Sequence, residues 1–285
     1  MTAIVTWNVQ ACRGVDGGVD PGRIARVIRS MGPVDVVCLQ EVSRNDPEAD
    51  GDAPVDQAAA LSELFPDFEV YYGAAIDRAG GADGRRWQFG NMILTRPQAV
   101  QAFRHSLPRP ADGASKHMPR QATEIVIAER GRALRIVTTH LEYYSAAQRA
   151  AQIDRLRELQ AEAGANHRTP PPDPGRGPFA AAPRPASLVL CGDFNLVAGD
   201  DHYRRVIAAA ADDACSLFDG WTSCRGDVAH DPTCGVFDGD QWPGGAHCRD
   251  FMFVTRDVAR RIRSIDVDLD TDASDHQPIR LDLDW

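Results

Sequence analysis

The stretch Leu188-Val189-Leu190-Cys191-Gly192-Asp193-Phe194-Asn195 runs from apolar residues directly into a carboxylate and an amide. Its first half has the uninterrupted apolar character of a strand that is buried on both faces. The same pattern recurs along the chain, where apolar runs at 4–7, 34–39 and 134–139 lead into Asn8, Glu41 and His140. Polar side chains at the carboxyl ends of strands are where α/β sheets place their chemistry.

Helical patterns separate several of these strands, which indicates an α/β fold. Asp20 and Pro21 supply a helix start, and Gly32-Pro33 ends that helix. Ser145 and Gln148 have the spacing of a capping box ahead of a second amphipathic helix. The periodicity also predicts a short helix at 57–64 and further strands at 70–75, 89–95, 122–128, 251–255 and 279–285.

The length and charge of the chain narrow its class. It has 285 residues, of which 31 are basic and 41 acidic, so the formal net charge is −10. This balance argues against a protein that coats nucleic acid or anionic lipid, since such binding depends on basic residues that neutralise phosphates. Folds of this size often form one unit, and we expect a single domain over 1–285.

Two stretches lack any regular pattern. Residues 164–186 are rich in Pro, Gly and Ala, so we expect a flexible surface loop there rather than a boundary between domains. The segment 221–247 is also expected to be a loop.

The expected location is the cytoplasm. The sequence opens without the basic and apolar regions of a signal peptide, and it has no apolar stretch long enough to cross a membrane. Its seven cysteines are an odd number without a metal-binding spacing, which favours a reducing compartment.

The polar residues at strand ends form the main functional signal. Any one of them has a structural explanation, but carboxylates, amides and imidazoles gathered at buried strand ends require an ion to compensate them. The set comprises Asn8, Glu41, His140, Asp193, Asn195, Asp250, Asp275 and His276. Carboxylates and amides without a cysteine–histidine set favour a hard cation, magnesium or manganese.

These residues lie in blocks that resemble a known family. In order and spacing, the blocks resemble the endonuclease/exonuclease/phosphatase superfamily over residues 4–284: Thr6-Trp7-Asn8, Leu39-Gln40-Glu41, Thr139-His140-Leu141, Gly192-Asp193-Phe194-Asn195 and Ser274-Asp275-His276-Gln277-Pro278. The resemblance implies a four-layer α/β/β/α sandwich, with two mixed β-sheets packed face to face and helices outside. It also implies a metal-dependent hydrolase of phosphate esters.

The resemblance further implies a role for each residue. Glu41 would bind magnesium or manganese, with Asn8 and Asp275 contributing directly or through water. Asp193 would orient or deprotonate the attacking water, and Asn195 would hold that water or a phosphate oxygen. His276, backed by Asp250, would contact the phosphate, and His140 would stabilise charge or assist the leaving oxygen.

Other residues leave alternatives open. Asn91 and Arg120 either contact the substrate phosphate or have structural roles. The cysteines and histidines of 224–248 fit no standard zinc spacing and could instead shape substrate access. Trp87, Tyr143, Tyr144 and Trp242 could stack on a ligand, although aromatic residues beside turns more often serve packing.

The substrate is predicted from the net charge and from the lack of Arg/Lys clusters. A small organic phosphate is favoured over nucleic acid as the partner, and no membrane contact is expected. The alternatives are an endonuclease or exonuclease acting on DNA or RNA and, as a less favoured interpretation, a binding module without catalysis.

Overall fold

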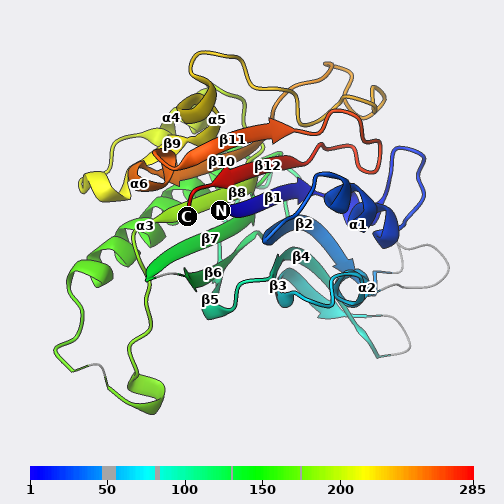
Figure 1. Cartoon of the computed structure of the whole chain (residues 1–285). Helices are drawn as coiled ribbons and strands as arrows, with labels where there is room; N and C mark the ends of the chain where they lie inside the picture. The colour runs from blue at the N-terminus through cyan, green and yellow to red at the C-terminus, as the bar shows by residue number, and fades with distance from the viewer. Residues whose placement is uncertain (47–55, 81–83, 130, 174) are drawn as a thin grey trace.

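Two β-sheets packed face to face form the centre of the protein, with helices on their outer faces (Figure 1). The computed structural model describes residues 1–46, 56–80, 84–129, 131–173 and 175–285. Within these residues, twelve strands form two six-stranded sheets. The expected four-layer α/β sandwich is therefore confirmed.

The first sheet has the order β11-β12-β1-β2-β4-β3. Its strands, in chain order, are β1 (Thr2–Asn8), β2 (Val36–Arg44), β3 (Glu69–Ala79), β4 (Arg86–Thr95), β11 (Ile262–Val267) and β12 (Ile279–Leu283). β1 and β2 run parallel, whereas the other described pairs in this sheet are antiparallel.

The second sheet has the order β5-β6-β7-β8-β10-β9. Its strands are β5 (Ala99–Ser106), β6 (Gln121–Glu129), β7 (Arg132–His140), β8 (Leu188–Asp193), β9 (Leu217–Asp219) and β10 (Asp250–Thr255). Here β7 and β8 are the parallel pair among the described strands. The two sheets thus have the same arrangement, a central parallel pair with antiparallel strands on either side, although the sequence itself shows no internal repeat.

The two parallel strand pairs account for two of the helices. Parallel neighbours need a crossover connection, and α1 (Pro21–Ser30) joins β1 to β2 as α3 (Ala146–Arg168) joins β7 to β8. The remaining helices are α2 (Gln57–Leu64), α4 (Asp201–Ile207), α5 (Gly220–Arg225) and α6 (Arg256–Ala259), with short 3₁₀ turns η1 (Gln10–Cys12), η2 (Gly177–Phe179) and η3 (Asp213–Cys215).

Three apolar layers hold the sandwich together. Alternate residues of each central strand point to opposite faces, so in β2 Cys38 lies between the sheets while Leu39 faces α1 and α2. In β8, Cys191 likewise lies between the sheets and Leu190 packs toward the layer of Ile153 and Leu156 from α3. Burial on both faces explains why these strands are continuous apolar runs.

The structure corrects two expectations about loops. Residues 164–168 belong to the last turns of α3, so the irregular segment begins later than predicted, and it contains η2. The segment 221–247 is largely irregular, as expected, but most of α5 lies within its start.

Candidate active site

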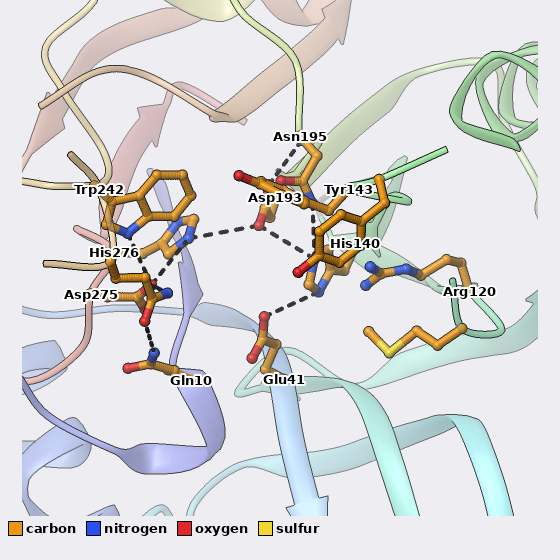
Figure 2. A pocket seen from close by; sticks show the side chains of 13 residues that line it. Gln10, Glu41, Arg120, His140, Tyr143, Asp193, Asn195, Trp242, Asp275 and His276 are labelled. Atoms are coloured by element: carbon orange, nitrogen blue, oxygen red, sulfur yellow. Dashed lines mark hydrogen bonds and ion pairs between the residues drawn. The ribbon is translucent and has the colours of Figure 1, made fainter. Parts of the chain in front are cut away.

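The parallel pairs bring four predicted residues to one edge of the sandwich. Asn8 is the register partner of Gln40, the residue before Glu41, and His140 is the register partner of Asp193. Parallel neighbours end on the same side, and β1 and β2 pack against β8 and β7. The carboxyl ends of both pairs therefore open into the same space (Figure 2).

Two further segments complete this edge. Asp250 begins β10 directly opposite Asp193 in the antiparallel register. Asp275 and His276 lie in the segment before β12, where the backbone nitrogen of Gln277 donates to Thr233 O. Residues separated by most of the chain thus come together through strand pairing.

Unusual backbone conformations occur at the strand ends. Glu41 has φ 60° and Asn195 has φ 51°, and the β2–β4 register shifts between Leu39 and Val42. Such left-handed conformations at non-glycine residues cost free energy and cluster at functional sites. Gly192 also has a positive φ, 132°, and a Cβ at this position would lie 2.0 Å from the backbone oxygen of Thr139.

A cavity of about 340 Å³ lies at this edge (Figure 2). The predicted site residues that line it are Glu41, Arg120, His140, Asp193, Asn195, Asp275 and His276. Asn8 and Asp250 contact these residues without lining the cavity themselves. Asn91 does not reach it, because its amide nitrogen donates to the backbone and side-chain oxygens of Gln121.

His276 forms a tight pair with Asp250. Its Nδ1 lies 2.8 Å from Asp250 Oδ2, and Thr233 donates its hydroxyl to the same oxygen. Burial alone would lower the pKa of the imidazole, but the Asp250 charge and hydrogen bond raise the pKa of His276 well above its usual value. The ring is therefore a cation near neutral pH.

His140 is held in the opposite protonation state. Burial, together with the charges of Arg120 and His276, lowers its pKa well below the usual range. The amide nitrogen of Asn195 donates to Leu141 O and lies 3.1 Å from His140 Nε2. Since an amide nitrogen only donates, Nε2 accepts and the ring proton resides on Nδ1, 3.6 Å from Glu41 Oε1.

Asn8 connects two carboxylates. Its amide nitrogen donates to Glu41 Oε1 at 3.0 Å and to Asp193 Oδ2 at 3.1 Å. Its amide oxygen accepts from the backbone nitrogen of Gln10, which fixes this orientation. The structure thus gives Asn8 a role in positioning both carboxylates, with its oxygen directed away from them.

The carboxylates of the cavity have the properties of a cation site. Burial raises the pKa of Glu41, Asp193 and Asp275, and the Asp275 charge helps to raise the pKa of Glu41 to about 7. These groups point toward one space in Figure 2. Carboxyl groups that do not ionise readily beside one another fit a site for a hard divalent cation, because the charge of the ion would favour their ionised forms.

A second donor group lies beside the first. Asp193, Asp250 and His276 can each place one ligand atom within 4.8 Å of the others. The Oδ1 atom of Asp250 is buried and has no hydrogen-bond partner within the described part of the chain. Within this group, Nδ1 of His276 is already hydrogen-bonded to Asp250 Oδ2.

Arg120 carries an uncompensated donor. Its side chain is 6% exposed, and its Nε donates to Glu142 Oε2 at 3.3 Å. Its Nη1 is buried without a hydrogen-bond partner among the described residues. Burial lowers the pKa of the guanidinium, against the opposing effect of Glu142 and Glu41. Figure 2 shows this side chain directed toward His140. Arg120 therefore lines the cavity, whereas Asn91 does not. The sequence left a phosphate contact and a structural role open for both residues.

Several residues that line the cavity were not predicted as site residues, or were given a packing role, in the sequence analysis. Gln241 and Trp242 donate to Asp275 Oδ2, and Gln10 donates to Gln241. Tyr143 and Tyr144 also line the cavity. Tyr143 and Tyr144 follow the His140 block directly, and this position was the one signal in the sequence that could have placed them at the site. No feature of the sequence connected Gln10 or Gln241 to Asp275.

The segment 224–248 does not assemble a zinc site in the described residues. Cys234 Sγ lies 3.5 Å from His247 Nε2, but His230 pairs with Asp219 and Cys248 donates to the backbone of Asp250. The segment instead supplies the Gln241 and Trp242 side chains to the cavity. Across the described helices, none combines the length and apolar character of a membrane span.

Comparisons with solved structures identify the fold. An endonuclease/exonuclease/phosphatase from Beutenbergia cavernae is 23% identical, with a TM-score of 0.71 over 99% of this chain and 71% of its own. A mannosyl-6-phosphatase from Bacteroides thetaiotaomicron is 17% identical, with a TM-score of 0.70 over the full length of both chains. The 3′ phosphatase NExo from Neisseria, solved with a product DNA hairpin, is 18% identical with a TM-score of 0.61 over 100% of both chains.

Comparisons of sequence agree with the fold. No curated protein matches the chain closely enough to be informative. The model of the Endonuclease/Exonuclease/phosphatase family matches residues 5–276, a range that contains every strand-end residue described above. On this evidence, the chain belongs to the endonuclease/exonuclease/phosphatase family, whose members hydrolyse phosphate esters.

Proposed function

We propose that this protein is a divalent-metal-dependent hydrolase of a small organic phosphate ester. The observation that carries the proposal is the convergence of Glu41, Asp193 and Asp275 with the His276–Asp250 pair around one cavity. Two buried carboxylates, a third that is partly exposed and a buried imidazolium match the needs of attack on an anionic phosphate by water.

Magnesium or manganese would be held by Glu41 and Asp275. When bound, such an ion supplies positive charge that offsets the charge of the phosphate. Trp242 and Gln241 fix Asp275 from one side, and Asn8 fixes Glu41 from the other. The protein thus holds both carboxylates in place before any ion binds.

Asp193 is the proposed general base. Its Oδ1 accepts from the backbone nitrogen of Asn195, which leaves Oδ2 facing the histidines and Asn8. Burial raises its pKa, and a carboxylate with a raised pKa is a stronger base toward water. Asn195 would hold the water or a phosphate oxygen.

The cationic and donor groups would bind the phosphate. His276 contributes a full positive charge, and the unpartnered Nη1 of Arg120 contributes a buried donor. His140, as a neutral ring, stabilises developing charge by hydrogen bonding rather than as a cation. A cavity of about 340 Å³ suits a compact ligand.

The test is hydrolysis of bis(p-nitrophenyl) phosphate and p-nitrophenyl phosphate in magnesium, manganese or EDTA. We expect metal-dependent release, and Asp193→Ala should lower kcat by at least about 100-fold because the general base is lost. Asp201→Ala is the matched control, since this aspartate is 97% exposed in its side chain and should retain activity.

Release that persists in EDTA or in the Asp193→Ala variant would contradict the proposed roles. The faster ester distinguishes a phosphodiesterase from a phosphatase. Absence of release from a folded protein that binds manganese would support the binding-module alternative.

A further inference from the structure

One wall of the cavity is aromatic. It consists of Tyr143, Tyr144 and Trp242, which we call the aromatic wall, and all three residues line the same cavity as His140 and His276. Tyr143 is 40% exposed and Tyr144 is 59% exposed, whereas Trp242 is 8% exposed. Exposed aromatic faces beside reacting groups are a common feature of ligand sites.

The aromatic wall is braced from behind. Tyr143 meets Tyr144 edge-on at 4.8 Å and Trp242 edge-on at 6.3 Å, measured between ring centroids. The guanidinium of Arg249 lies 5.2 Å from the centroids of both Tyr143 and Trp242, and its Nε is bonded to His247 at 2.7 Å. Tyr143 and Trp242 are therefore held in place without a ligand, and Tyr144 packs edge-on against Tyr143.

The same wall is joined to the reacting groups. Trp242 donates its indole nitrogen to Asp275 Oδ2 at 3.2 Å and meets the His276 ring edge-on at 5.7 Å. The wall thus runs from the proposed metal ligand Asp275 outward to Tyr144. A phosphate placed at His276 would direct its ester group along this surface.

Polar groups on the other walls are already engaged. Gln241 donates to Asp275 and accepts from Gln10, and Asn195 donates to Leu141 and contacts His140. Beyond the groups assigned to phosphate, the surface left for the rest of a substrate is aromatic, with Met118 beside it. A hydroxyl-rich group would find few free partners among these engaged amides.

We propose that the aromatic wall is the leaving-group subsite and that the substrate carries a planar aromatic ring on its ester group. This inference rests on the proposed phosphoesterase function and specifies its substrate class. In the reaction, the oxygen of water bonds to phosphorus, the bond from phosphorus to the ester oxygen breaks, and the aromatic alcohol leaves with one proton. Tyr144, as the most exposed member, is the specificity residue.

The test compares two ligands of similar size that differ in planarity. Binding of benzylphosphonate and cyclohexylmethylphosphonate to the manganese-loaded protein is measured by calorimetry. We expect the aromatic ligand to bind roughly 2- to 10-fold more tightly, the range given by aromatic pairing beyond area burial. Tyr144→Leu should lower this ratio, because the most exposed ring of the wall is lost, while the affinity for the cyclohexyl ligand stays within about twofold.

Phe179→Leu is the matched control. Phe179 is 84% exposed in η2 and does not line the cavity, so its loss should leave the ratio unchanged. Equal affinities in the wild type, a ratio that survives Tyr144→Leu, or absence of binding at millimolar concentration would each overturn the subsite.

A parallel assay separates this inference from the proposed function. Hydrolysis of benzyl phosphate and cyclohexylmethyl phosphate is followed by phosphate release, because both esters leave as alcohols of similar acidity. Equal hydrolysis of both esters would refute the subsite and keep the phosphoesterase. Selective binding of benzylphosphonate, with no turnover of these esters or of the nitrophenyl esters, would refute catalysis and keep the subsite.

Discussion

Among single residues, Glu41 lowers the stability of the metal-free protein when its carboxyl is ionised. Its pKa of about 7 lies above the ordinary 4.5, first because of burial and then because of the charge of Asp275. A carboxyl whose pKa is raised in the folded state stabilises the protein below its unfolded pKa and loses that contribution as the pH rises through the folded pKa. The left-handed backbone of Glu41 adds to this cost.

This predicts that Glu41→Gln stabilises the metal-free protein at pH 8. The expected gain is about 1 to 3 kcal/mol in the free energy of unfolding, because each pKa unit corresponds to about 1.4 kcal/mol and the side chain is partly exposed. The gain should vanish near pH 4.5. Urea unfolding in EDTA at both pH values measures it, with the exposed Glu158→Gln as the control.

Metal addition gives the complementary result for the same residue. At pH 8, manganese should raise the free energy of unfolding of the wild type and have a much smaller effect on Glu41→Gln. A variant that is less stable than the wild type at both pH values in EDTA would contradict this account of Glu41.

At the scale of elements, Glu124 joins several parts of the second sheet. This β6 residue is fully buried and accepts hydrogen bonds from Arg135 of β7 and from Arg184 of the segment before β8, and it also contacts His105 of β5. Burial alone would raise its pKa, but the hydrogen bonds from His105, Arg184 and Arg135 lower the pKa well below its usual value.

Glu124→Gln should therefore destabilise the protein by about 3 to 5 kcal/mol at pH 7, since it leaves buried arginine charge unpaired. A lowered pKa gives stability that is present above the unfolded value and lost as the pH falls, so the difference from the wild type should shrink toward pH 3. Urea unfolding at pH 7 and 3 checks this.

The control uses an ion pair of the same kind at the surface. Glu162 pairs with Arg155 at 2.8 Å but is 48% exposed in its side chain, so Glu162→Gln should cost less than about 0.5 kcal/mol. Equal effects of the two substitutions would show that the Glu124 network contributes nothing beyond a surface pair.

For the whole molecule, the charge distribution favours the proposed small substrate over a polymeric one. The net charge is −10, and many surface arginines are engaged with aspartates, as in Arg205 with Asp154 and Arg256 with Asp213. Arginines paired in this way are less available to bind a run of phosphates along a nucleic acid.

We predict a weak dependence of activity on salt. Between 50 and 200 mM sodium chloride, kcat/KM for the preferred nitrophenyl ester should change by less than about threefold, because binding of a single phosphate releases few counterions. The same assay with a DNA oligonucleotide tests the nuclease alternative. Rapid cleavage of DNA that falls steeply over this salt range, by a factor of about 10³ or more, would favour the nuclease.

The central strands and most of the residues that meet at the candidate site could be predicted from the sequence because their signals are local. β1, β2, β7 and β8 are buried on both faces and therefore appear as apolar runs, and the polar residues that end them are visible as residue types. The strands β5, β9 and β11 were not predicted. They lie at or next to the sheet edges, where one face is partly exposed or the strand is short, so their patterns are weak.

What the tertiary structure alone decided is how these residues meet. The sequence left the same two alternatives open for Asn91 and Arg120, yet packing of the two sheets directs Asn91 of β4 to Gln121 of β6 and leaves Arg120 with an unpartnered donor at the cavity. The tertiary structure also brings Trp242 to Asp275 and Tyr143 to Arg249. These contacts join segments that share no local sequence pattern. Residue type and strand burial are properties of a short stretch of chain, whereas contacts, protonation states and cavity walls depend on packing between distant segments, which no local periodicity records.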